Sequence, residues 1–175
     1  VYAQMQQLDQ VVFSGFTHEP AIALSEALIS LLPENQEKLF FSDNGSTATE
    51  IGIKMALQYH HNLGKKRSVL MAFEDGFHGD TFGAMSVSGL SVYNGPFEDA
   101  NLEGLLHELE NTMDLDAVAG FIYEPLVQGA AAMKMHKAEH LEKILKVIKS
   151  HGVLAIADEV MTGFGKTGRH FASDY

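Results

Sequence analysis

Two carboxylates that could take part in chemistry, Asp158 and Glu159, follow a short apolar run near the end of the sequence. Five apolar residues, 153–157, run directly into them, and a glycine-rich turn over 163–168 follows. The apolar run predicts a buried parallel strand that delivers Asp158 to the carboxyl edge of a sheet, where open α/β sheets bind ligands. A half-buried carboxylate at such an edge either binds a cation or stabilises a protonated heterocycle through a charge-assisted hydrogen bond. The alternative is structural, with Asp158 capping the start of a helix.

A nucleotide-phosphate site is the other chemistry that this segment suggests, because Gly165-Lys166-Thr167 resembles the end of a phosphate-binding loop. Such a loop needs a glycine five positions before the Gly-Lys-Thr, where this chain has Val160. The loop also precedes the acidic strand in nucleotidases, whereas here it follows. We therefore set the nucleotidase interpretation aside.

The segment 43–47 combines a glycine and two hydroxyls with the start of a predicted helix. The free N–H groups and the dipole of a helix start attract phosphate, and the candidate ligands are Gly45, Ser46 and Thr47. An N-cap by Ser46, with no ligand, explains the same residues.

Two further turns carry aromatic and polar side chains. Phe77 and His78 stand between glycines, which let a backbone approach a ligand closely, and an exposed Phe can stack on a flat ring. A buried Phe and a structurally satisfied His are the alternative. In the third turn, Gln128 can donate to a ring hydroxyl or oxyanion and Glu124 can hold a partner side chain. Polar turn residues in solvent would explain both.

Alternating strands and helices must position these turns. We predict helices over 21–32, 47–62, 80–86, 101–111 and 138–150, and strands over 38–42, 68–73, 119–123 and 153–157. This alternation favours an α/β protein of three layers, α/β/α, with a mainly parallel sheet. Right-handed crossovers would bring the polar strand ends to one edge of that sheet.

The bulk composition excludes several classes of protein. The 175 residues are 46% hydrophobic and 20% charged, which is ordinary for a globular domain. A net charge of −11 disfavours nucleic acid as a partner. The absence of cysteine excludes disulfides and thiolate metal sites, and we expect no metal. No apolar run is long enough for a membrane span, so we expect a cytoplasmic protein, and the start at Val1 suggests the interior of a longer chain.

Four of these motifs, taken in order, resemble class III, pyridoxal-phosphate-dependent aminotransferases. They are the phosphate-type turn, Phe77-His78-Gly79, the Glu124-Pro125-x-x-x-Gly129 turn and the segment 158–168. The resemblance implies the large domain of a fold type I pyridoxal-phosphate enzyme, of which residues 1–175 would form part. It also implies a homodimer that acts on a small-molecule amino donor and a keto acceptor.

Within that family, three segments are most similar to members of the biotin pathway, which transfer an amino group from S-adenosylmethionine to 8-amino-7-oxononanoate. These segments are 15–20, 55–59 and 78–87. The alternatives are a family member of the ornithine or 4-aminobutyrate type, or a catalytically silent fragment.

The resemblance also assigns roles around a bound pyridoxal 5'-phosphate. Asp158 would pair with the protonated pyridine nitrogen, and His78 would support the segment that stacks on the ring. Phe77 and Val160 would cover the two ring faces. The phosphate would be bound by Gly45, Ser46 and Thr47, and the ring hydroxyl would be approached by Gln128.

Two features depart from the family. The Schiff-base lysine and the small C-terminal domain would lie beyond Tyr175, since Lys166 belongs to the glycine turn and does not match the family's lysine motif. The family also has a longer connection than this chain between 97–99 and 101–103, so a loop is either deleted here or missing from the 175 residues. We therefore expect residues 1–175 alone to be catalytically incomplete.

Overall fold

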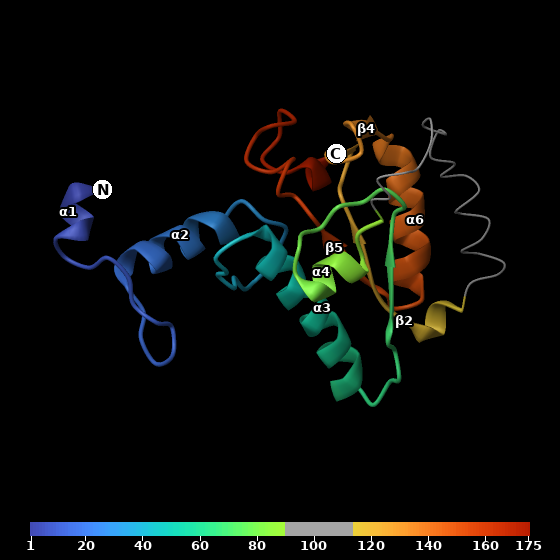
Figure 1. The fold of residues 1–175 in the computed structure, drawn as a ribbon, viewed down its shortest axis with the longest axis horizontal. Helices are drawn as coiled ribbons and strands as arrows, with labels where there is room; N and C mark the ends of the chain where they lie inside the picture. The colour runs from blue at the N-terminus through green and yellow to red at the C-terminus, as the bar shows by residue number, and fades with distance from the viewer. Residues whose placement is uncertain (90–113) are drawn as a thin grey trace. The chain divides into compact units, whose positions relative to one another are not determined.

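The computed structural model describes residues 1–89 and 114–175. The chain divides into two compact units, Val1–Phe41 and Ser42–Tyr175 (Figure 1). The helix predicted over 101–111 and the short connection at 97–103 lie outside the described residues.

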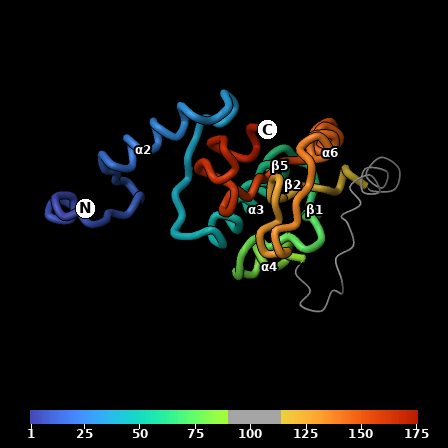
Figure 2. Tube along the Cα trace, turned by 90° about the horizontal axis from the view of Figure 1, so that it is seen from above, coloured from blue at the N-terminus to red at the C-terminus, as the bar shows by residue number. Residues whose placement is uncertain are grey.

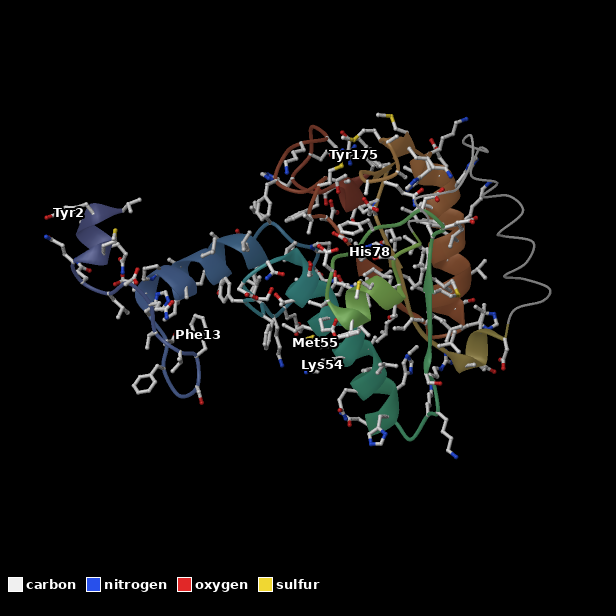
Figure 3. All side chains as sticks on the ribbon, viewed as in Figure 1. Tyr2, Phe13, Lys54, Met55, His78 and Tyr175 are labelled. Carbon is white, nitrogen blue, oxygen red and sulfur yellow. The ribbon has the colours of Figure 1, made fainter. Side chains whose placement is uncertain are left out.

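The first unit contains α1, Tyr2–Met5, and α2, Glu19–Ile29. Pro20 lies in the first turn of α2, where its fixed φ favours a helix, and the helix predicted over 21–32 is confirmed apart from its last turn. The strand predicted over 38–42 is wrong. Phe40 is 65% exposed, and the ring of Phe41 stacks on Phe13, which Figure 3 labels. Although the residues are apolar, a strand also needs a neighbour to bond its N–H and C=O groups, and the described residues supply none there.

A parallel sheet forms the centre of the second unit. Its strands are β1, Val69–Ala72, β2, Val118–Tyr123, and β5, Leu154–Ala157, in the order β1-β2-β5. Both pairings are parallel, with Ile122 beside Ala72 and Ile156. All six residues of β2 are buried, because a central strand of such a sheet is covered on both faces.

Helices cover the two faces of this sheet. α6, Ala138–Ser150, packs Ile144 and Ile148 into a core cluster with Phe121. α3, Gly45–Asn62, packs Ile53 into a second cluster with Ile122. Since neighbouring residues of a strand point to opposite faces, the two helices lie on opposite sides of β2 (Figure 2). The predicted α/β/α layering is confirmed.

Shorter elements complete the second unit. They are α4, Phe82–Ser86, the 3₁₀ helices η1, Leu115–Ala117, and η2, Ala172–Asp174, and the antiparallel pair β3, Val127–Gln128, with β4, Lys134–Met135. In the described ranges, every helix is too short or too polar to cross a membrane.

Arg67 organises the amino edge of the sheet. Its side chain is buried, and one guanidinium nitrogen donates to the carbonyls of Leu115 at 3.0 Å and Val118 at 2.9 Å. The other donates to the carbonyl of His151 at 2.7 Å, just beyond the end of α6. One cation therefore satisfies the carbonyls where β2 begins and where α6 ends.

Candidate functional site

The four turns singled out in the sequence meet at the carboxyl edge of the sheet. His78 bonds Asp158, the Phe77 amide bonds Glu124, and Ser46 bonds the Asp80 amide. These partners are 80, 47 and 34 residues apart in the chain. Only the parallel topology brings them together, as the crossover argument predicts.

Asp158 is held rigidly at the end of β5. Its amide donates to the Tyr123 carbonyl at 2.8 Å, and its Oδ1 accepts the Val160 amide at 3.1 Å. Its Oδ2 lies 2.8 Å from Nδ1 of His78, which donates because a carboxylate only accepts. Turns rather than a helix follow Asp158, so the helix-capping alternative is wrong.

His78 is fully buried behind this carboxylate. Its side chain is 0% exposed, against 9% for Asp158, and the ring lies in the interior of the second unit (Figure 3). The second ring nitrogen, Nε2, is buried and has no hydrogen-bond partner among the described residues. The ring therefore orients Asp158 directly, a pairing that the sequence did not suggest.

Asn44, rather than Ser46, caps α3. Oδ1 of Asn44 accepts the Thr47 amide at 3.0 Å, and Oγ1 of Thr47 accepts the Asn44 amide at 3.3 Å. The Thr47 hydroxyl also donates to Asp43 at 2.6 Å and thereby lowers the pKa of that carboxyl. Within residues 1–89 and 114–175, the amides of Gly45 and Ser46 have no partner. The helix start thus offers two free N–H donors.

Close packing fixes this helix start against the turn before α4. The Ser46 hydroxyl accepts the Asp80 amide at 3.1 Å. Gly79 has a φ of +122°, and a Cβ there would lie 2.6 Å from Cα of Ser46. Gly79 thus permits contact between two chain segments, whereas the sequence had suggested room for a ligand. Glu50, which sequence reasoning missed, accepts the Thr81 hydroxyl at 2.7 Å, and that bond lowers the pKa of Glu50.

Gly45 brings the helix start beside the turn that follows Asp158. A Cβ at Gly45 would lie 3.0 Å from Cγ2 of Val160. The Val160 side chain is nonetheless 68% exposed, and Phe77 is 38% exposed. Each therefore presents apolar surface that a flat ring can cover.

The third turn is buried and tied to the second. Gln128 is 3% exposed, and its Nε2 donates to the Glu74 carbonyl at 2.9 Å. Glu124 is also buried, and it accepts the backbone amides of Phe77 and Gly129. The alternative of polar residues in solvent is therefore wrong for both, and the partners of Glu124 are backbone groups rather than a side chain.

Glu159, which the sequence placed beside Asp158, makes contacts within the chain that sequence reasoning did not foresee. Its carboxylate accepts the Thr162 hydroxyl at 2.7 Å and the amides of Ala172 and Ser173, both at 2.9 Å. It closes the glycine-rich turn, on which Lys166 is exposed. Multiple acceptance by one carboxylate leaves no local signal in a sequence.

The donors and surfaces at this edge fit a flat, phosphorylated heterocycle. Two free helix N–H groups suit a phosphate, and an oriented carboxylate suits a protonated ring nitrogen. The described residues contain no group of three or more side chains that could hold a metal ion.

Two curated relatives share a name. The chain is 44% identical to the adenosylmethionine-8-amino-7-oxononanoate aminotransferase of Synechococcus elongatus, over 97% of this chain and 45% of the relative. It is 36% identical to the enzyme of that name from Staphylococcus aureus, over 97% of this chain and 44% of the relative. The chain thus spans less than half the length of these relatives.

Solved structures agree with this family. The adenosylmethionine-8-amino-7-oxononanoate aminotransferase of Methanocaldococcus jannaschii superposes with a TM-score of 0.90 at 32% identity, over 99% of this chain and 43% of that one. A PLP-bound amine transaminase from an uncultivated Pseudomonas species gives 0.85 at 30% identity, over 99% and 46%. The family model for class-III aminotransferases matches residues 1–175. The chain therefore belongs to the class-III aminotransferase family.

Proposed function

We propose that the complete protein is a pyridoxal-phosphate-dependent aminotransferase that transfers an amino group from S-adenosylmethionine to 8-amino-7-oxononanoate. The product would be 7,8-diaminononanoate, a precursor of biotin. The choice of these two substrates is supported by the names of the relatives. The observation that carries the chemistry is the buried His78–Asp158 pair beside a helix start whose first two N–H groups have no partner among the described residues.

Each end of the cofactor has a matching group in this proposal. The free amides of Gly45 and Ser46 bind the phosphate, while the hydroxyl and amide of Thr47 remain committed to the cap of α3. Asp158 holds the proton on the pyridine nitrogen, and His78 keeps that carboxylate aimed.

The ring itself is positioned by three side chains. Phe77 and Val160 cover its faces and exclude water, and the second N–H of the Gln128 amide donates to the ring hydroxyl oxygen. Pyridoxal phosphate supplies, when bound, a ring that withdraws electrons from the α-carbon of the amino donor.

Residues 1–175 form, in this proposal, part of the cofactor-binding large domain. The lysine that joins the cofactor covalently lies outside them. We further propose that the complete enzyme is a cytoplasmic homodimer. The family resemblance supports the homodimer, and sedimentation of the complete protein tests it.

Absorbance and product analysis of the complete protein test the proposed function. We expect visible absorption from bound pyridoxal phosphate, a borohydride-trappable adduct, and formation of 7,8-diaminononanoate from the two named substrates. Binding of cofactor with turnover of ornithine or 4-aminobutyrate instead would move the protein to another branch of the family. Failure to bind the cofactor at all would support a catalytically silent module.

A further inference from the structure

Glu124 is a buried carboxylate to which the aminotransferase proposal gives no role. Its side chain follows β2 directly, and the residue is 6% exposed. Within the part of the chain that the structure describes, no Lys, Arg or His lies at ion-pair distance from it. A buried carboxylate without a cation needs other donors, because its desolvation is otherwise uncompensated.

Two backbone amides supply those donors, one to each carboxylate oxygen. Oε1 accepts the Phe77 amide at 3.1 Å, and Oε2 accepts the Gly129 amide at 2.7 Å. Phe77 belongs to the turn that follows β1, whereas Gly129 comes directly after Gln128 at the end of β3. The Glu124 side chain therefore links two turns. One turn carries Phe77, which is assigned to a face of the ring, and the other carries Gln128, which is assigned to the ring hydroxyl.

The local chain is shaped to make this bridge. Leu126 has a φ of +64°, so the chain reverses after Pro125 and returns the Gly129 amide to Glu124. A Cβ at Gly129 would meet the Met161 side chain, in the turn that follows β5. Gly129 therefore lies between Glu124 and the segment that carries Asp158.

We propose that Glu124 is a positioning residue for the cofactor ring. Its two oxygens hold the Phe77 turn and the Gln128–Gly129 turn at a fixed separation, so that the stacking group and the hydroxyl contact engage the ring together. The inference rests on the proposed function, since it presumes that pyridoxal phosphate is the ligand. Glu124 acts through the two turns and does not touch the reacting atoms.

Glu124→Gln in the complete protein is the first test. The amide retains one acceptor, but its NH₂ faces a backbone N–H, so one of the two bonds is lost. We expect the dissociation constant for pyridoxal phosphate to rise about tenfold. The visible circular dichroism per bound cofactor should also fall, since the ring is held less uniquely. Glu142→Gln on α6 removes an exposed carboxylate that is bonded to Lys146 and serves as the matched control.

Each result has a distinct meaning. If the wild-type protein does not bind pyridoxal phosphate, the proposed function fails before Glu124 is tested. If Glu124→Gln lowers thermal stability but keeps the affinity within about twofold and the dichroism per bound cofactor unchanged, the role is structural only and the inference is overturned. Glu124→Asp, which keeps the charge and withdraws it by one methylene, should repeat the spectroscopic loss and replaces the first variant if that one does not fold. Failure of both variants to fold would also overturn the inference, by placing Glu124 in the formation of the fold.

Discussion

The two edges of the central sheet are both polar, but they use their polar groups differently. At the amino edge, the buried Arg67 donates to three backbone carbonyls, from η1, β2 and the residue after α6. At the carboxyl edge, the largely buried carboxylates of Glu124 and Asp158 accept backbone amides instead. One edge is closed by a cation and the other is organised by carboxylates.

The difference lies in what each edge leaves unfilled. Every bond of Arg67 joins parts of the chain to one another, so the amino edge has a structural role. The carboxyl edge leaves the amides of Gly45 and Ser46 free among the described residues, and Val160 largely exposed. Buried polar groups therefore do not by themselves identify a site. Free N–H donors beside fixed carboxylates do indicate a site, because the fold leaves them available to bind a ligand.

Replacing Asp158 should give the largest effect, and it should fall on activity alone. In the complete enzyme, Asp158→Asn cannot hold the proton on the ring nitrogen, which should cost about 3–5 kcal/mol, or roughly two to four orders of magnitude in kcat/KM. The fold should survive, since the His78 imidazole can change tautomer to suit the amide. Steady-state kinetics and far-ultraviolet circular dichroism measure the two parts. Activity within tenfold of wild type would remove Asp158 from its assigned role.

Replacing Arg67 should have the opposite profile, with a large loss of stability and little change in cofactor affinity. Arg67→Met leaves several buried carbonyls without a donor and should lower the free energy of unfolding by about 3 kcal/mol. Urea denaturation of the cofactor-free protein measures this loss. Lys66→Met, at the exposed neighbouring position, is the control. A loss below about 1 kcal/mol would show that water replaces the guanidinium at this edge.

Ser46 and Asn44 separate ligand binding from helix capping at the start of α3. The Ser46 hydroxyl oxygen accepts the Asp80 amide, which leaves its O–H to donate to the phosphate beside the backbone amides. Ser46→Ala should therefore weaken pyridoxal phosphate binding by roughly 1.5–3 kcal/mol, the value of a hydrogen bond to a charged group. Asn44→Ala should lower stability by about 1 kcal/mol through loss of the cap and change the affinity little. Titration of the cofactor and thermal unfolding of both variants test the pair. The reverse pattern would restore the capping role to Ser46.

Acid should weaken the packing on both faces of the sheet. Burial lowers the pKa of His60, whose Nε2 lies 3.1 Å from the Ala119 carbonyl, and that of His136, beside Phe73, below their ordinary value of 6.5. As the pH falls, these two histidines therefore become protonated in the unfolded chain before they do so in the folded chain. Stability is full above pH 6.5 and falls as the pH drops towards the native pKa values, by at most about 1.4 kcal/mol per pH unit for each group. Urea midpoints against pH, with His60→Gln as the comparison, should show a shallower acid loss in the variant.

The sequence predicted the elements whose signals are local. α6 begins and ends at the predicted residues because Leu141, Ile144 and Ile148 recur at helical spacing between charged side chains. β2 agrees to within one residue because its apolar run is continuous. The strand predicted over 38–42 was wrong because pairing depends on a neighbour elsewhere in the chain.

The site was predicted as a set of turns but not as a set of contacts. Family resemblance and strand-end position indicated Asp158, Gly45 and Gln128. Nothing local indicates that His78 lies against Asp158, or that Asn44 rather than Ser46 caps α3, since both residues at the helix start are competent caps. Which one caps depends on where the backbone enters the helix, and this is a property of the folded chain.

The His78–Asp158 bond, which joins residues 80 apart, has a consequence for the order of folding. A contact over so long a loop forms only after the entropy of closing that loop has been overcome, and such contacts form late. The partners cannot meet until β5 has docked beside β2. In a refolding experiment on the complete protein, the visible spectrum of bound pyridoxal phosphate should therefore appear after the far-ultraviolet signal of the helices, and it would report that β5 has joined the sheet.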